Sequence, residues 1–381
     1  MFLMKYTFLL IVSVLSLSML AQEDKNPLRD MKLRNVGPAA MSGRVTSIDV
    51  NLKNDQEIYA GTASGGLWRS RSGGQKWECI FNNEATLSIG AVKISQRNTD
   101  VIWVGTGEGN PRNSHNSGKG IYKSIDGGVN WMLMGLENTR NIHKILIHPD
   151  DENIVYAAAI GVAWGESEDR GVYKSIDGGQ TWENILYMNE ITGAADLVMD
   201  PENPSKLIVA MWEHRRWPWF FNSGGEGSGI HVTYDGGKSW EKRTDKNGLP
   251  KGQLGRVGLA ISKSNTKVVY ALVENAKKNA LYRSNDGGLN FSKVSENENI
   301  GNRPFYYSDI HVSPENEDIL YSLWTYLSKS KDGGKTWTRI PYNRIHPDHH
   351  AFWVHPEKPN YLIEGNDGGL NISRDAGKTW R

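Results

Sequence analysis

Several carboxylates lie in segments of the sequence that are rich in glycine, arginine and aromatic residues. The candidates for acid or base chemistry are Glu108, Glu166, Glu213, Glu364 and Asp367. Two carboxyl groups roughly 5 to 10 Å apart can hydrolyse a glycosidic bond, one as acid and the other as nucleophile or base. The residue types therefore allow a glycoside hydrolase, although they do not indicate which two would form the pair.

The segment WEHRRWPWFFNSGGEGSG interleaves aromatic side chains with arginine, glutamate and histidine. Its candidates for ligand contact are Trp212, His214, Arg216 and Trp217. Aromatic rings stack on the apolar faces of a sugar while charged side chains bond to its hydroxyl groups, and the same mixture suits a protein partner. An ordinary packed loop is the alternative interpretation. Two further segments carry polar residues of this kind: WGESEDRG, and GEGNPRNSHNSGKG with Asn110, Arg112, Asn113 and His115.

Three arginines occupy comparable places before strand-like runs. Arg44 in SGRV and Arg256 in LGRV match in two repeats, and Arg303 begins RPFYY, which also contains the candidate Tyr306. Because a guanidinium binds a carboxylate or phosphate with two parallel hydrogen bonds, the three could converge on an anionic ligand. The alternative is that they pair with glutamates or backbone carbonyls inside the protein.

The run of His346, Asp348, His349 and His350 contains residue types that bind metals. Adjacent residues of a strand point to opposite faces of the sheet, so His349 and His350 are not expected to share one ion. We therefore predict no metal site and no cofactor, and assign His350 a hydrogen-bonding role in the ligand site.

An acidic, glycine-rich octet organises the rest of the chain. SIDGGVNW (residues 124–131) returns as SIDGGQTW (residues 175–182), and five variants bring the number of copies to seven. Successive copies lie 43 to 58 residues apart, which is the length of one four-stranded blade of a β-propeller. Short runs rich in β-branched and aromatic residues fill each interval, and no segment has the pattern of a long amphipathic helix.

The sequence thus predicts an all-β fold, a seven-bladed β-propeller of four-stranded antiparallel blades, with each octet at the turn between the third and fourth strands. There an Asp side chain can accept backbone N–H bonds while glycines adopt positive φ, so we assign the aspartates a structural role. They are Asp126, Asp177, Asp235, Asp286, Asp332 and Asp375. The long loops with the candidate residues then share the opposite face, and long loops usually carry function.

The first 21 residues combine Lys5 with an apolar run of about 15 residues, the pattern of a secretory signal peptide. The run is shorter than the roughly 20 residues of a membrane span, so we expect export to the periplasm, cell surface or medium, and no membrane span after cleavage. A retained N-terminal anchor is the alternative. A short linker (residues 22–30) would then lead into the propeller (residues 31–381).

Charge is nearly balanced, with 44 basic and 43 acidic residues, so the composition does not support nucleic-acid binding. The single cysteine, Cys79, cannot form an internal disulfide, so core packing and strand pairing must hold an exported protein together. Neither feature indicates an oligomeric state.

Seven octets in register resemble the Asp-box, or BNR repeat, of sialidases, sortilin-type propellers, two-propeller xyloglucanases and photosystem II stability factors. More closely, NVGPAAMSGRV, GTASGGLWRS, RPFYYSDI and DHHAFWVHP resemble exported bacterial sortilin-like proteins described as "glycosyl hydrolase, BNR repeat". The box serves enzymes and non-enzymes alike, so the resemblance implies the fold and not a reaction. Those relatives are typically longer, which allows this chain to be the N-terminal propeller of a larger protein.

The catalytic residues of these families have few counterparts in this sequence. In the segment resembling GTASGG, where the xyloglucanases carry a catalytic Asp, this chain has Ala63 and Ser64, and the sialidase FRIP segment and Tyr-Glu nucleophile pair are not matched. We therefore interpret the chain as an exported scaffold that binds glycan or protein ligands on its long-loop face. A glycoside hydrolase with paired carboxylates on that face is the alternative. An assembly factor of the photosystem-stability type is a third possibility.

The last octet, SRDAGKTW, ends one residue before the C-terminus, where the fourth strand of a seventh blade should begin. Propellers often close with a strand from the far terminus. We therefore predict that residues 32–36 complete the seventh blade, because this removes an open sheet edge.

Overall fold

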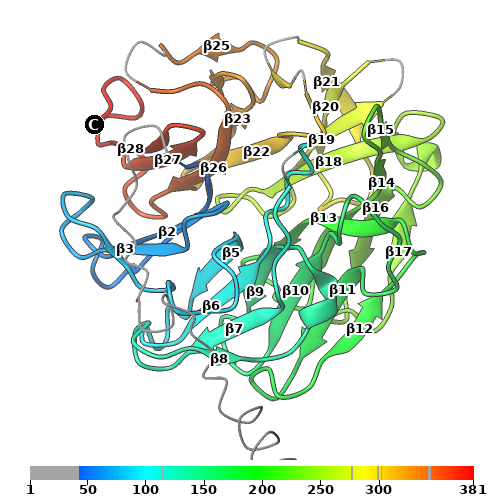
Figure 1. Ribbon diagram of the computed structural model, residues 1–381. Helices are drawn as coiled ribbons and strands as arrows, with labels where there is room; N and C mark the ends of the chain where they lie inside the picture. Colours follow the sequence, from blue (N-terminus) through cyan, green and yellow to red (C-terminus); the bar gives the residue numbers. More distant parts are fainter. Residues whose placement is uncertain (1–42, 114, 276–277, 298–299, 302, 342–344) are drawn as a thin grey trace, which may run out of the picture. The chain divides into compact units, whose positions relative to one another are not determined.

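Seven antiparallel sheets make up the part of the chain that the structure, a computed structural model, describes (Figure 1). That part is residues 43–381, without residues 114, 276–277, 298–299, 302 and 342–344, and it belongs to one compact unit, Gly37–Arg381. In six of the sheets, strands that follow one another along the chain are hydrogen-bonded neighbours, and the fourth sheet has one additional short strand outside this order. The predicted all-β, seven-bladed propeller of antiparallel blades is thus confirmed.

The first four blades have the following bounds. The first consists of β1 (Val45–Val50), β2 (Ile58–Thr62), β3 (Leu67–Ser70) and β4 (Glu78–Cys79). The second consists of β5 (Ile89–Ile94), β6 (Ile102–Thr106), β7 (Ile121–Ser124) and β8 (Met132–Leu133), followed by the 3-10 helix η1 (Glu137–Thr139). The third consists of β9 (Ile142–Ile147), β10 (Val155–Ala159), β11 (Gly171–Ser175) and β12 (Glu183–Leu186). The fourth consists of β13 (Thr192–Met199), β14 (Leu207–Arg216), β16 (Gly229–Thr233) and β17 (Glu241–Arg243), with β15 (Phe221–Ser223) paired to the end of β14.

The last three blades follow the 3-10 helix η2 (Asp245–Asn247). The fifth consists of β18 (Leu254–Ile261), β19 (Val269–Asn275), β20 (Ala280–Ser284) and β21 (Ser292–Ser295). The sixth consists of β22 (Asp309–Ser313), β23 (Asn316–Leu323), β24 (Leu327–Ser330) and β25 (Thr338–Arg339). The seventh has β26 (His349–Val354), β27 (Leu362–Asn366) and β28 (Gly369–Ser373), and Arg381 exchanges two backbone hydrogen bonds with Ile372, where fourth strands begin in other blades.

The innermost strands of the blades form a closed ring. β1, β5, β9, β13, β18, β22 and β26 contact one another in this order, and β26 contacts β1. Apolar clusters lie between neighbouring blades; for example, Tyr59 and Leu67 of the first blade pack with Ile89 and Val104 of the second. Because each blade buries its apolar face against the next, the ring has no separate central core.

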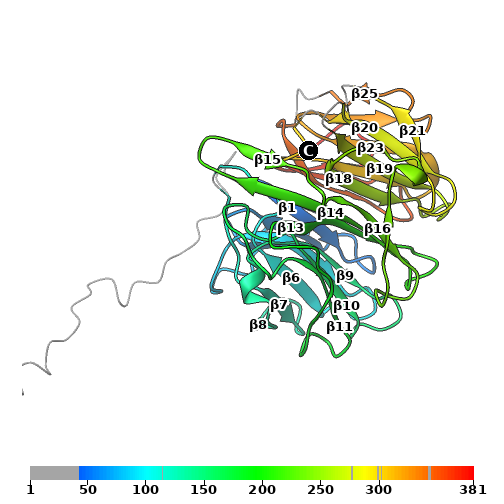
Figure 2. The ribbon, with the colours of Figure 1, turned by 90° about the vertical axis from the view of Figure 1, so that its right-hand side faces the viewer.

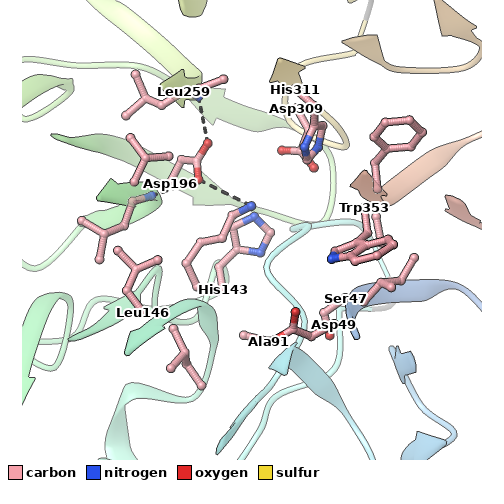
Figure 3. A pocket seen from close by; sticks show the side chains of 18 of the residues that line it. Ser47, Asp49, Ala91, His143, Leu146, Asp196, Leu259, Asp309, His311 and Trp353 are labelled. Atoms are coloured by element: carbon pink, nitrogen blue, oxygen red, sulfur yellow. Dashed lines mark hydrogen bonds and ion pairs between the residues drawn. The ribbon is translucent and has the colours of Figure 1, made fainter. Parts of the chain in front are cut away.

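The middle of the ring is a polar hollow of about 440 Å³, lined by the innermost strands (Figure 3). Lys144 Nζ lies 3.5 Å from Asp196 Oδ1, and Asp196 Oδ2 accepts a 2.8 Å bond from the backbone N–H of Leu259. Although burial raises it, the pKa of Asp309 falls to about 2 because Lys144 and Arg256 favour its carboxylate. The buried charges of the hollow therefore compensate one another across blades.

Each octet forms a turn in which the hydroxyl of its first residue, Ser or Thr, accepts a bond from the glycine N–H four positions later. In the third blade, Ser175 Oγ accepts a bond from the N–H of Gly179 (2.8 Å), and Asp177 accepts from the N–H and the hydroxyl of Thr181 (3.0 and 2.6 Å). Gly179 has a φ of +94°, and an added Cβ would lie 2.4 Å from Trp103, so glycine is required there. Trp182 donates to Met134 O of the preceding blade at 2.8 Å. The octet carboxylate is therefore engaged by its own turn, and the octet aromatic joins two blades.

Three predictions fall on residues outside the described part of the chain. They are the signal peptide (residues 1–21), the short linker (residues 22–30) and the strand at residues 32–36 that would complete the seventh blade. Among the described residues, no helix is long and apolar enough to cross a membrane.

Acid should destabilise the ring through the octets. Bonds from backbone and side-chain groups of the same turn lower the pKa of Asp126, Asp332 and Asp375 to about 2. In the unfolded chain these groups titrate near pH 3.9, so their stabilising effect is complete above about pH 4 and is lost as the pH falls towards 2. We expect the urea midpoint of unfolding to drop across this range, and to drop less in the triple Asp→Asn variant. An equally steep drop in that variant would contradict the assignment.

Candidate functional site

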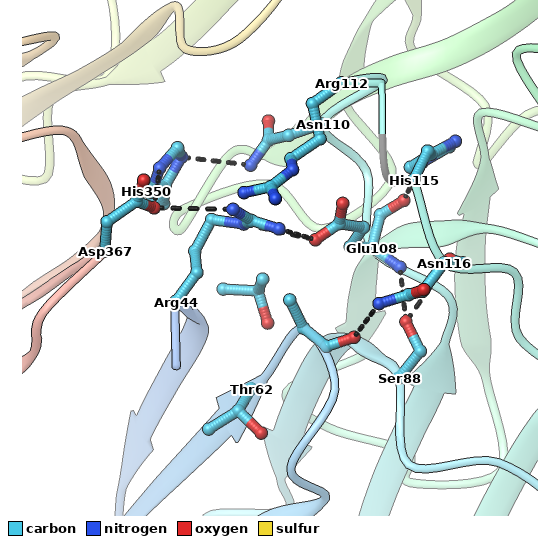
Figure 4. A network of polar contacts seen from close by, with 12 residues as sticks. Arg44, Thr62, Ser88, Glu108, Asn110, Arg112, His115, Asn116, His350 and Asp367 are labelled. Carbon is cyan, nitrogen blue, oxygen red and sulfur yellow. Dashed lines mark hydrogen bonds and ion pairs between the residues drawn. The ribbon is translucent and has the colours of Figure 1, made fainter. Parts of the chain in front are cut away.

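Arg44 lies at the centre of a buried network on the long-loop face (Figure 4). Its Nε and Nη2 donate to Glu108 Oε2, the Nε bond being 3.1 Å long, and its Nη1 donates to Tyr306 Oη at 3.0 Å. Nη1 also lies 3.4 Å from Asp367 Oδ1, and Tyr306 Oη donates to Asp367 Oδ2 at 2.8 Å. Side chains from the second, sixth and seventh blades thus meet at the guanidinium of Arg44, which belongs to the first blade.

The loop after β6 holds Glu108 in place through its backbone. Gly107 has a φ of +83°, and a Cβ there would lie 2.0 Å from Arg140 O, so only glycine fits where the chain leaves the strand. The carbonyl of Glu108 accepts bonds from His115 Nε2 (2.6 Å) and Asn141 Nδ2 (2.7 Å). These contacts hold the backbone of Glu108 in place, and its carboxylate is directed at Arg44.

The two carboxyl groups beside Arg44 differ in their proton affinity. Burial raises the pKa of Glu108 even though Arg44 opposes the shift, and Glu108 Oε1 has no hydrogen-bond partner among the described residues. Although burial raises it too, the pKa of Asp367 lies well below its usual range because His350, Tyr306 and Arg44 favour the ionised form. Neighbouring carboxyl groups with separated pKa values are typical of acid and base pairs.

His350 connects this network to the ring interior. Asn110 Oδ1 accepts from Arg256 Nη1 (3.1 Å), so Asn110 Nδ2 donates to His350 Nδ1 (3.2 Å). The imidazole proton then lies on Nε2, which donates to Asp367 Oδ1 at 3.0 Å. Burial lowers the pKa of His350, which agrees with a neutral ring in this role.

His349 points to the other side of β26. Its Nδ1 contacts Glu364 Oε1, and both side chains are fully buried. Glu364 also accepts bonds from Asn366 and Asn371, at 3.0 and 2.9 Å. Adjacent histidines therefore serve different networks, as the alternation of a strand requires. In the described part of the chain, no group of three or more His, Cys, Asp or Glu side chains could hold a metal ion.

An open hollow of about 720 Å³ borders the Arg44 network. A smaller one of about 310 Å³ contains Ala63 and Ser64 and shares Arg112 and Asp367 with it. The larger hollow combines arginines, aromatic rings and two aspartates: Arg112, Asn113, Arg216, Phe221, Arg303, Phe305, Tyr306, Asp348 and Asp367. It is the part of the long-loop face at which charged and aromatic side chains are both accessible.

Convergence of Arg44, Arg256 and Arg303 on one ligand stays a prediction, and the alternative of pairing inside the protein describes the contacts of Arg44 and Arg256. Arg256 is only 2% exposed and lies beneath Asn110 and over the Trp212 ring, while Arg44 is occupied by its carboxylates. Of the three, only Arg303 lines the larger hollow. Arg112, in the loop after β6, and Arg216, at the end of β14, line this hollow with Arg303.

The tryptophan-rich segment also differs from the expectation of a loop. β14 continues to Arg216, so alternate residues Trp212, His214 and Arg216 point inward. Trp212 and His214 are fully buried, stack with their ring centroids 4.3 Å apart, and support the hairpin from inside. Their burial does not agree with the prediction that these two side chains contact a ligand directly.

The tip of the β14–β15 hairpin is aromatic and exposed. Figure 2 shows the hairpin at the edge of the described unit. Trp217 stacks on Phe220, with ring centroids 4.5 Å apart, and Trp219 is 77% exposed. Phe221, at the start of β15, lines the larger hollow, so the tip and the hollow adjoin along one strand.

The two remaining carboxylate candidates lie elsewhere. Glu213 accepts a 3.0 Å bond from the N–H of Gly227, and Glu166 is exposed in the loop between β10 and β11. Neither lines the two hollows. Sequence reasoning did not single out Phe221 and Phe305, although both lie in quoted segments, and it missed Asn141, which lies in no quoted motif.

The family model of Sortilin-Vps10 (sortilin, neurotensin receptor 3) matches residues 119–248. A xyloglucanase from a Paenibacillus species is 23% identical over 347 residues, covering 81% of this chain and 32% of the relative. The xyloglucanase Xgh74A of Acetivibrio thermocellus is also 23% identical, covering 81% of this chain and 39% of the relative. The chain thus spans about a third of the length of the curated relatives it matches.

Two solved structures share the fold. A GH74 xyloglucanase from Xanthomonas campestris superposes with a TM-score of 0.65 and 17% identity, over 91% of this chain and 54% of the other. YCF48 bound to D1 peptide superposes with a TM-score of 0.58 and 14% identity, over 90% of this chain and 97% of the other. The resemblance to BNR-type propellers, including the xyloglucanases and the stability factors, is confirmed for the fold.

Removal of Arg44 should destabilise the protein strongly. Arg44→Met leaves Glu108 buried without its partner, and loss of one member of a buried ion pair costs about 3 to 5 kcal/mol. The double variant Arg44→Met/Glu108→Gln should recover part of this loss, because no uncompensated charge remains. Urea unfolding measures both, with Arg71→Met, whose side chain is 61% exposed, as the control that changes stability little. Equal losses in the single and double variants would contradict the pairing.

Proposed function

We propose that this chain is an exported ligand-binding propeller that holds glycan or protein ligands on its long-loop face. The observation that carries the proposal is the open hollow of about 720 Å³, in which arginines and aromatic rings lie together beside an exposed aromatic hairpin. Pockets of this size and mixed lining are typical of ligand sites. Export rests on the signal-like segment at residues 1–21.

The similarity to named proteins supports both ligand classes. Relatives over most of this chain are xyloglucanases, which supports a glycan, and a propeller of the same fold is bound to a peptide, which supports a protein ligand. We favour the glycan because the sequence relatives, and not only the fold, point to polysaccharide.

Hydrolysis is the second candidate, and one observation favours it. Glu108 and Asp367 flank Arg44, with the pKa of the first raised and that of the second lowered. Against it, Glu108 is fully buried and its Oε2 is bonded to Arg44, so it does not reach a glycosidic oxygen in this arrangement. Binding without cleavage therefore agrees better with the geometry.

Substitution at the hairpin tip should weaken ligand binding. We expect Trp219→Ala to raise the Kd of the glycan about tenfold, the effect of losing one well-packed aromatic contact of about 1.4 kcal/mol. Calorimetry with xyloglucan oligosaccharides and a panel of other plant and bacterial glycans measures it. Tyr234→Ala, which removes a 43% exposed aromatic from an octet turn, is the matched control. Absence of saturable binding to every glycan and peptide tested would overturn the proposal.

The same panel separates binding from hydrolysis. We expect no release of reducing ends from any glycan that the protein binds, because Glu108 is held by Arg44. Reducing-sugar assays with Glu108→Gln and Asp367→Asn as comparison variants test this. Release by the wild type that disappears in both variants would establish the hydrolase instead.

A further inference from the structure

Two arginines of the larger hollow, Arg216 and Arg303, contact neutral groups. Arg216 donates to Pro111 O (2.8 Å) and to Asn113 Oδ1 (2.7 Å). Arg303 stacks on the Tyr306 ring at 4.9 Å, and it is exposed. No ion pair among the described residues involves Arg216 or Arg303, so their positive charges are not compensated by the carboxylates of the described part.

The two aspartates of the hollow have donors of their own. Asp348 accepts a 2.8 Å bond from Tyr307 Oη, and Asp367 accepts from Tyr306, His350 and Arg44. Their charges are therefore directed at the protein and not at the arginines across the hollow. The accessible surface thus combines uncompensated cations with carboxylate oxygens that can still accept from a hydroxyl group.

Aromatic rings fix how the guanidinium groups meet a ligand. The Arg216 guanidinium lies 4.6 Å from the Phe221 ring centroid and 5.7 Å from that of Phe305. A guanidinium whose face is covered by a ring still has N–H groups along its edge, which suit a carboxylate. Burial lowers the pKa of Arg216, so an anion beside it would relieve an unfavourable environment.

We propose that this hollow binds the carboxylate of an acidic sugar, a uronate unit of a glycan, with Arg216 and Arg303 as its cationic contacts. The proposal rests on the binding function proposed above and specifies its ligand. Asp348 and Asp367 would accept bonds from the hydroxyl groups of the same sugar, which a simple peptide carboxylate does not offer. The hollow of about 720 Å³ has room for more than one sugar unit.

Calorimetry with tetragalacturonate, its methyl ester and a neutral xyloglucan heptasaccharide tests this proposal. We expect the acid to bind at least about tenfold more tightly than the ester, because the ester keeps the hydroxyl groups and loses the charge. Arg303→Gln should remove most of this difference, and Arg303→Lys should restore part of it, since lysine keeps the charge but not the paired N–H geometry. Arg216→Gln should have the same effect if this variant folds. Because Arg303 is exposed, the Arg303 variants test the proposal without disturbing the fold.

The control is Arg374→Gln, since Arg374 also stacks on a tyrosine, Tyr361, but in an octet turn. Equal affinity for the acid and the ester would overturn the carboxylate proposal and leave the glycan-binding function standing. A carboxylate-bearing peptide that binds more tightly than the acid glycan would overturn the choice of a sugar. Loss of discrimination in Arg374→Gln, but not in Arg303→Gln, would overturn the location.

Discussion

The buried guanidinium of Arg44 is the interaction on which the long-loop face depends. It joins a residue of the first blade to Glu108, Tyr306 and Asp367, which lie 64, 262 and 323 positions away in the sequence. A buried charge costs several kcal/mol unless it is paired, so these groups stay together and the loops that carry them stay in register. The interaction thereby ties the last blade to the first, and these two blades are also neighbours through their innermost strands.

Because of this interaction, the carboxylates and the arginines of the long-loop face have different roles. The carboxylates that resemble an acid and base pair are engaged by Arg44, whereas Arg216 and Arg303 of the neighbouring hollow contact neutral oxygens and aromatic rings. A buried carboxylate that is paired with an arginine helps to hold its loop in place. A cation without a carboxylate partner attracts anionic ligands. This contrast leads us to favour binding over hydrolysis, although the relatives in sequence are enzymes.

The octets differ from the Arg44 network because their hydrogen bonds join residues that are close in the sequence. In the six octets that contain an Asp, the carboxylate accepts from groups no more than four residues away, as Asp177 does from Thr181. Such a turn can be repeated around a ring because its hydrogen bonds do not depend on the residues of the opposite face. Function on this fold is therefore free to change in the loops while the turns stay the same, which is why a propeller that binds a peptide and propellers that are xyloglucanases superpose on this chain.

The sequence by itself determined the repeat, the number of blades and the face that carries the octets, because octet hydrogen bonds are local and their spacing is visible in the letters. It also placed His349 and His350 on opposite sides of one strand. Only the tertiary structure decided that Trp212 and His214 are buried, and that Arg112 and Arg216 border the hollow in place of Arg44 and Arg256. Burial and charge pairing depend on loops from several blades, so no single stretch of sequence contains them.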